Sequence, residues 1–190
     1  MLDTKAAEKL LPLLQLACKN YPQHAEYPAA IIKVSEQSLY VFKNDECIAQ
    51  YPVSTSRYGV GQAQESNQTP LGVHSVKEKI GGNAKPGEIF ISRQPTNNTA
   101  AIEHNAVCTN EECITSRILW LSGMEQGINK GHRPNGVCVD SYERYIYIHG
   151  THEEGLIGQT ASIGCIRMKN ADVIDLYNLL MISSLVIIAE

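Results

Sequence analysis

Two short stretches near the C-terminal end carry the fold and the chemistry of this chain: Ile148-His-Gly-Thr151 and, after a glycine-containing loop, Ser162-Ile-Gly-Cys-Ile-Arg-Met168. The first ends an apolar run that predicts a strand, which places His149 at a strand end. In the second, Cys165 directly follows Gly164, a residue that permits a tight turn. The loop between the two stretches is short enough for a hairpin to bring His149 and Cys165 face to face.

His149 and Cys165 together form a candidate pair of base and nucleophile. A cysteine attacks only as its thiolate, and a neighbouring imidazole can lower the thiol pKa or remove its proton. Gly164 would let backbone amides approach a substrate carbonyl and form an oxyanion hole. Taken singly, a cysteine is commonly a small buried hydrophobe, and a histidine at a strand end is commonly a core residue. Their occurrence in one short region favours catalysis.

The sequence around these stretches predicts mainly strands. Short β-branched or aromatic runs are separated by turn residues through most of the chain. They predict strands at 31–34, 38–42, 47–54, 73–80, 89–91, 118–121, 145–148 and 184–189. Helical spacing of apolar residues predicts helices over 4–19 and 170–181, with Asn170 as the N-cap of the second. The expected fold class is therefore mainly β (α+β), a sandwich or barrel-like sheet with an N-terminal helix and a C-terminal helix.

Charge and cysteine content narrow the choice of partner and compartment. A net charge of -4, without a run of Lys or Arg, argues against binding to nucleic acid or an anionic membrane. The N-terminus lacks a basic cluster, so residues 4–19 are interpreted as a surface helix rather than an export signal. Six cysteines are too sparse for a disulfide scaffold, which favours a reducing compartment. We therefore expect a cytoplasmic protein, with the periplasm as the alternative.

Residues of metal-binding type also occur in the middle of the chain, namely His104, Cys108, Cys113, His132 and Cys138. Their spacing contains no Cys-x-x-Cys pair and the surrounding sequence is polar, so neither a metal nor another cofactor is expected. His152, three positions after the histidine of the first stretch, is expected to be a solvated loop residue.

The two stretches, together with Tyr51-Pro-Val-Ser-Thr55 and Thr69-Pro-Leu-Gly72, resemble the YkuD family of L,D-transpeptidase catalytic domains. The resemblance runs over about residues 31–188. It implies a catalytic domain over residues 29–190, preceded by an N-terminal helical attachment over residues 1–28.

The resemblance also assigns roles to the motif residues. Cys165 matches the family nucleophile, His149 the general base, and Gly150 the residue whose backbone carbonyl orients the imidazole. The remaining motif positions, which are assigned to substrate binding, are Thr151, Ser162, Gly164 and Arg167.

Some of these positions keep alternative roles. Arg167 either clamps a substrate carboxylate with two parallel N–H groups or holds the loop through backbone carbonyls. Ser162 is better suited to stabilising the turn than to reacting. Ile163 departs from the family pattern, in which His or Arg is common at this position. The departure bears on the acceptor or substrate and not on the nucleophile.

The resemblance implies attack on a peptidoglycan stem peptide, at the carbonyl of an L-configured centre that is typically in meso-diaminopimelate. The terminal D-alanine leaves and a thioester forms on Cys165. Because no export signal or peptidoglycan-binding module is recognised, the expected function is an L,D-carboxypeptidase that trims tetrapeptide muropeptides during murein recycling. One alternative is an exported L,D-transpeptidase that forms 3–3 cross-links. The other is a non-catalytic domain that binds cell-wall peptides or a metal. No protein partner is implied.

Overall fold

The computed structural model describes residues 3–109 and 111–190. Its helices are α1 (Thr4–Asn20) and α2 (Asn170–Leu179), with the short 3₁₀ helices η1 (Pro22–His24), η2 (Val34–Glu36) and η3 (Glu154–Leu156). Its strands are β1 (Ala29–Lys33), β2 (Ser38–Lys43), β3 (Glu46–Pro52), β4 (Gly72–Ile80), β5 (Glu88–Ile91), β6 (Gln94–Thr99), β7 (Ile114–Gly123), β8 (Tyr147–Gly150), β9 (Ile166–Met168) and β10 (Leu185–Ala189).

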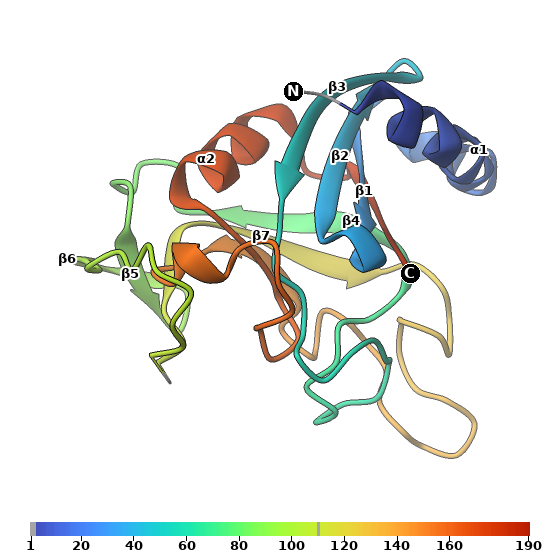
Figure 1. Ribbon diagram of the computed structural model, residues 1–190. Helices are drawn as coiled ribbons and strands as arrows, with labels where there is room; N and C mark the ends of the chain where they lie inside the picture. Colours follow the sequence, from blue (N-terminus) through green and yellow to red (C-terminus); the bar gives the residue numbers. More distant parts are fainter. Residues whose placement is uncertain (1–2, 110) are drawn as a thin grey trace.

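Within the described part of the chain, ten strands form one mixed and curved sheet (Figure 1). The order along its main path is β3-β2-β1-β10-β4-β7-β5-β6, and β8 and β9 branch from β7. The long strand β7 is central because it pairs with β4, β5 and β8. Most neighbours are antiparallel, but β1 runs parallel to β10 and β8 runs parallel to β9. The predicted fold class, mainly β with a helix near each end, is confirmed.

The larger hydrophobic core lies between the sheet and α2. Val173 and Leu176 of α2 pack with Ile148 of β8 and Ile166 of β9, and all four side chains are fully buried. Burying a side chain of this size stabilises a protein by about 1.5–3 kcal/mol. The helix that follows the second motif therefore holds the two motif-bearing strands in place.

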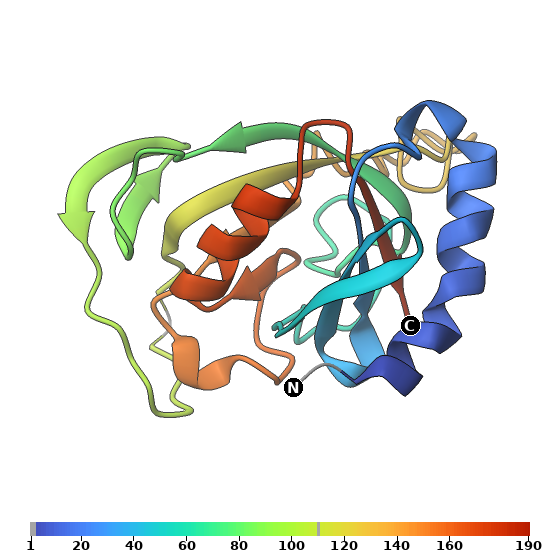
Figure 2. The ribbon, with the colours of Figure 1, turned by 90° about the horizontal axis from the view of Figure 1, so that it is seen from above.

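The N-terminal helix covers the opposite face of the sheet. Leu14 of α1 packs with Ile31 of β1 and Ile187 of β10, whereas Ala30 and Ile32 of β1 belong to the core under α2. Successive residues of a strand point to opposite faces, so β1 is buried on both sides. Figure 2 shows α1 on the outer side of these strands and α2 on the other side.

Several details differ from the sequence prediction, among them two strands, β6 and β9, that were not predicted. Asn170 is the first residue of α2 and not its N-cap, which is Lys169. The Asn170 side chain is instead used across the fold, where its Oδ1 accepts hydrogen bonds from Thr115 and Ser116 of β7. Strand β6 was not predicted because its sequence is almost entirely polar. The strand predicted at 118–121 is only the middle of the longer β7.

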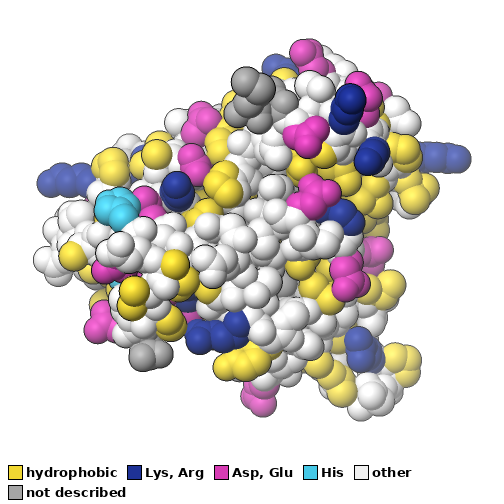
Figure 3. Space-filling view, in the orientation of Figure 1, with side chains coloured by type: hydrophobic (Ala, Val, Ile, Leu, Met, Phe, Trp, Pro, Cys, Tyr) yellow, Lys and Arg dark blue, Asp and Glu magenta, His cyan; other side chains and the backbone are white. Residues whose placement is uncertain are grey.

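The surface mixes charges of both signs. In the face shown in Figure 3, Lys and Arg side chains stand singly or in small groups among Asp and Glu. Among the described residues, none of the helices combines the length and the apolar character needed to cross a membrane.

Candidate active site

The parallel pair β8 and β9 positions the two predicted catalytic residues. His149 lies opposite Arg167 in the strand register, and Cys165 immediately precedes β9. The expected hairpin is therefore wrong: the chain returns through η3 and a turn, and β9 starts again in the same direction. Residues two apart in a strand share a face, so the His149 side chain points the same way as that of Tyr147. Cys165 packs against the hydrophobic cluster that contains Tyr147.

His149 is buried, with only 1% of its surface exposed. Its Nδ1 lies 2.8 Å from the backbone oxygen of Gly150. Because a carbonyl only accepts, Nδ1 carries the proton and Nε2 presents a lone pair. Burial lowers the pKa of His149 to about 4, aided by the nearby Arg167 charge and opposed by the Gly150 hydrogen bond. The imidazole is therefore neutral at neutral pH and able to accept a proton.

Cys165 is half-buried at the end of a turn. Its Sγ accepts a hydrogen bond from the Tyr147 amide at 3.4 Å and donates one to the Tyr145 carbonyl at 3.4 Å. Burial raises the pKa of the Cys165 thiol to about 11, with Glu112 adding to the effect. The Tyr147 hydrogen bond and two arginines act in the opposite direction without reversing it. The resting pair is thus a neutral thiol and a neutral imidazole, so His149 has to take the proton during attack.

The turn before Cys165 is built by local hydrogen bonds. Ser162 Oγ donates to the Cys165 carbonyl at 2.6 Å and accepts from the Gly164 amide at 3.2 Å. Gly164 has φ +130°, a backbone conformation open to glycine but strained for other residues. Thr69 Oγ1 donates to the Gly164 carbonyl at 3.0 Å. The Gly164 amide is therefore used inside the turn, and direct substrate contact by Ser162 or Gly164 stays a prediction.

Arg167 forms ion pairs with two carboxylates. Its guanidinium bonds to Glu153 at 2.8 Å and also to Glu112, and its side chain is only 3% exposed. The Glu153 side chain is equally buried, whereas that of Glu112 is 38% exposed. These contacts tie the segment before β7 to β9 and to the loop after β8. A substrate clamp by Arg167 stays a prediction.

Thr151 and Asn170 connect the end of β8 to its surroundings. The Thr151 amide donates to the Met168 carbonyl at 3.2 Å, and the Thr151 carbonyl accepts from Asn170 Nδ2 at 2.9 Å. Thr151 is 1% exposed. Gly150 is equally confined, because a Cβ there would lie 2.7 Å from the Thr115 backbone oxygen. The Gly150 carbonyl, which orients His149, is thus held in place from both sides. A role of Thr151 in substrate binding stays a prediction.

The family comparison agrees with these motifs. Residues 28–188 match the model of the L,D-transpeptidase catalytic domain, YkuD. The chain belongs to this family. No curated protein matches it.

Solved structures share the fold of this YkuD domain. An L,D-transpeptidase in complex with imipenem is 14% identical with a TM-score of 0.50, and the match covers 85% of this chain and 58% of that one. L,D-transpeptidase 3 from Mycobacterium tuberculosis with a faropenem-derived adduct is 14% identical with a TM-score of 0.50, and the match covers 86% of this chain and 60% of that one. A protein of Bdellovibrio bacteriovorus is 11% identical with a TM-score of 0.52, and the match covers 85% of this chain and 47% of that one. The match thus spans about half to three fifths of these chains.

Sequence reasoning missed several residues around the YkuD motifs. His152 was expected in solvent, yet it is 6% exposed, so that expectation is wrong. Thr109 explains the burial, because its side chain bonds to both His152 and Glu153 and covers them. The backbone groups of Tyr145 and Tyr147 that contact Cys165 left no signal in the sequence. The position of His152 and Glu153 directly after the His-Gly-Thr motif was the one available hint.

A cleft of about 210 Å³ opens beside the nucleophile. It is lined by Tyr145, whose carbonyl accepts from Cys165, and by Ile163 of the preceding turn. Exposed Glu65 and Glu143 add negative charge to its wall, whereas Arg144 adds a positive charge and donates to the carbonyls of Gly61, Gln62 and Gln68. The two carboxylates outnumber the one guanidinium, so a positively charged amine would find a net negative charge there.

Proposed function

We propose that this YkuD-family chain is an L,D-carboxypeptidase that removes the terminal D-alanine from tetrapeptide muropeptides. The observation that carries the proposal is the placement of Cys165 directly before β9, next to the strand β8 that holds a buried His149 whose Nδ1 is bound by the Gly150 carbonyl. Such a tautomer leaves Nε2 as a base on the face of the sheet where the thiol lies. This is the arrangement that a thiol nucleophile requires.

The reaction follows from the protonation states of the two groups. His149 accepts the thiol proton while Cys165 Sγ bonds to the carbonyl carbon before the terminal D-alanine. The bond to the D-alanine nitrogen then breaks, and the imidazolium gives its proton to that leaving amine. Water, deprotonated by the same imidazole, attacks the thioester and releases a tripeptide and the free thiol.

Two features support water as the acceptor and the cytoplasm as the compartment. Ile163 is 43% exposed beside the nucleophile turn and offers no polar group to position the amine of a second stem. The chain has six cysteines among 190 residues, too few for a disulfide scaffold, which favours a reducing compartment. Acidic Glu143 in the adjoining cleft suits a diaminopimelate-containing stem, because this residue carries a free amine.

The decisive experiment is mass spectrometry of the products formed from a disaccharide tetrapeptide, with and without glycine as an amine acceptor. Cys165→Ala is the inactive control. Cys47→Ala is the matched control, because Cys47 is half-buried and packs on the α1 side of the sheet. The expected result is tripeptide as the main product with the parent protein and Cys47→Ala, and no product with Cys165→Ala.

Each other outcome contradicts the proposal in a different way. Product containing glycine, or cross-linked dimer, would assign the chain to the transpeptidases instead. Unchanged substrate with all three proteins, each folded by circular dichroism, would favour a non-catalytic peptide-binding domain. For the compartment, fractionation of the native cells should place the protein with cytoplasmic markers, and recovery with periplasmic markers would support the exported alternative.

A further inference from the structure

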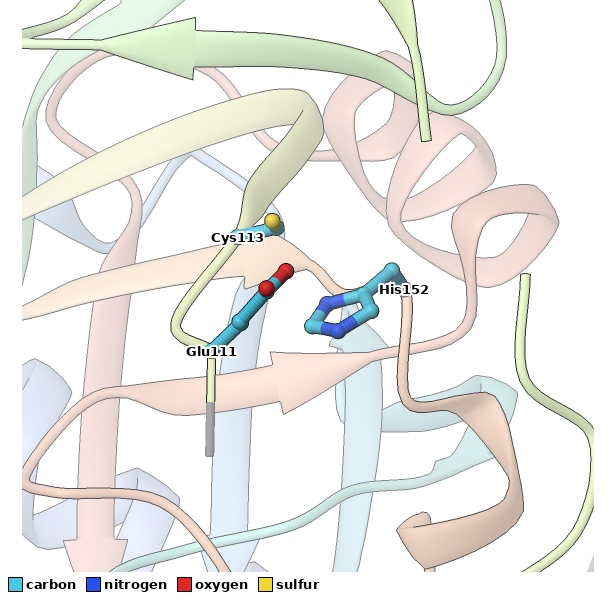
Figure 4. Close-up of side chains that lie close together, drawn as sticks. All are labelled: Glu111, Cys113 and His152. Atoms are coloured by element: carbon cyan, nitrogen blue, oxygen red, sulfur yellow. The ribbon is translucent and has the colours of Figure 1, made fainter. Parts of the chain in front are cut away.

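Three side chains with metal-binding atoms meet beside the end of β8. They are Glu111 and Cys113, which lie in the segment just before β7, and His152, which lies just after β8. One ligand atom from each lies within 4.8 Å of the others. Figure 4 shows the His152 ring turned toward the Glu111 carboxylate, with the Cys113 thiol on the far side of that carboxylate. The sequence prediction considered Cys113 but not the other two residues.

The hydrogen bonds of His152 define which nitrogen is available. Thr109 Oγ1 donates to Glu153 at 2.9 Å, and a hydroxyl has only one proton to give. Thr109 Oγ1 must therefore accept from His152 Nε2, which lies 2.8 Å away. That leaves His152 Nδ1 as an unprotonated lone pair, and Nδ1 is buried without a hydrogen-bond partner. A buried lone pair without a partner is unfavourable, and a cation between it and the neighbouring carboxylate would satisfy both groups.

The support around His152 resembles that of a metal-binding histidine. Such a histidine donates its other N–H to a carboxylate, a backbone carbonyl or a water, which fixes the orientation of the ring. Here the acceptor is the Thr109 hydroxyl, which is itself bound to the Glu153 carboxylate. Glu153 is in turn paired with Arg167. The orientation of the ring is thus set by a chain of hydrogen bonds that ends in an ion pair.

The donor set suits a zinc-type ion. A nitrogen, a thiolate sulfur and a carboxylate oxygen are the ligands that zinc takes in proteins, whereas magnesium and calcium prefer oxygen alone. Tetrahedral zinc with these bond lengths places its ligand atoms roughly 3.5 Å apart. The three atoms would therefore have to draw together by about 1 Å, and both the exposed Glu111 and the half-buried Cys113 side chains have room to move. Three protein ligands leave the fourth position for water or another small ligand.

The local charge also favours a cation. The carboxylates of Glu111, Glu153 and Glu112 lie close enough to the Cys113 thiol to act on it electrostatically. The same three carboxylates attract a divalent ion. The opposing charge is that of Arg167, which is already paired with two of them.

We propose that Glu111, Cys113 and His152 bind one zinc ion, which fastens the segment before β7 to the end of β8. Its three ligands do not include Cys165. The site nevertheless shares Glu153 and Arg167 with the strands that carry the nucleophile, so zinc should also make those strands more stable. The second group of metal-type residues, His132, Cys138 and Glu143, is a poorer candidate, because Cys138 already donates to Glu143 and two of the three residues are exposed.

The test is metal binding to the Cys165→Ala protein, a background in which the nucleophile cannot bind metal. Zinc affinity and stoichiometry are measured by competition with a chromophoric chelator. Cobalt replaces zinc for spectroscopy, because a thiolate ligand gives a charge-transfer band. The variants are Cys113→Ser, His152→Gln and Glu111→Gln, and Cys138→Ser is the matched control. Glu111 is exposed, so Glu111→Gln should fold even if the other two variants do not.

We expect one zinc per chain, a cobalt–thiolate band, and a melting temperature that rises with zinc. Changing a residue that only supports a ligand costs about 10–100-fold in affinity, so loss of the ligand Cys113 or His152 should weaken binding by about 100-fold or more. Glu111→Gln should weaken it by about tenfold or more, and Cys138→Ser should leave it unchanged. No binding to the Cys165→Ala protein would overturn the proposal. So would binding that survives Glu111→Gln intact, or binding that is lost with Cys138→Ser.

Discussion

The protonation state of Cys165 predicts how fast its thiol reacts with iodoacetamide. Burial raises the pKa of the thiol from an ordinary value of 9.0 to about 11. At pH 7 the thiolate fraction is then about one in ten thousand, against about one in a hundred for an ordinary thiol. A thiolate of higher pKa is intrinsically more nucleophilic, by about 6–10-fold for this difference. Cys165 should therefore react about 10–15-fold more slowly than a small thiol such as N-acetylcysteine amide.

The assay follows carbamidomethylation of the Cys165 peptide by mass spectrometry between pH 6 and pH 9, so the other cysteines do not interfere. The rate should rise about tenfold for each pH unit across this range, because the thiol titrates above it. A plateau near neutral pH, or a rate at pH 7 that equals or exceeds that of the small thiol, would show a preformed thiolate–imidazolium pair. That result would refute the assignment of His149 as a neutral base in the resting enzyme.

The companion variant His149→Gln separates the two roles of the histidine. If the neutral imidazole acts only during attack on substrate, alkylation of free Cys165 should change by no more than about twofold. Turnover of a tetrapeptide should fall by about 10²–10⁴-fold, the usual contribution of a positioned base. An equal loss in both measurements would mean that His149 already deprotonates the thiol before substrate binds.

Three further predictions concern the framework of the site. Arg167→Met should destabilise the fold by about 3–5 kcal/mol in urea unfolding, because it leaves the buried Glu153 carboxylate without its ion-pair partner. The control variant Arg133→Met, at an exposed position, should cost less than about 0.5 kcal/mol. Asn170→Ala removes hydrogen bonds to strand β7 and to the segment after β8 that includes η3. It should cost about 2–3 kcal/mol, and an unchanged urea midpoint would contradict that role. Gly164→Ala imposes about 1–3 kcal/mol of backbone strain on the turn and should lower Cys165-dependent turnover about tenfold, whereas Gly136→Ala, also at positive φ but with open space around it, should not.

The sequence pointed to His149 and Cys165 as a candidate catalytic pair because the signal is local. The two residues are separated by a short loop and stand in motifs that resemble those of the family. The strands were predictable for a similar reason, since apolar runs such as Ile31–Val34 have to be buried wherever they lie in the sheet. The polar strand β6 escaped prediction because it pairs with β5 without contributing an apolar face.

The sequence by itself determined the fold class and the family, and it pointed to a candidate thiol and imidazole, because each depends on neighbouring residues and their periodicity. Only the tertiary structure decided the environment of these groups. Glu112 reaches Arg167, and Thr109 covers His152, across more than forty positions of sequence. Such contacts depend on how β7 pairs with β8, and pairing between distant strands leaves no local pattern in the chain. The pKa of Cys165 and the burial of His152 depend on those contacts, so neither could be inferred from the sequence alone.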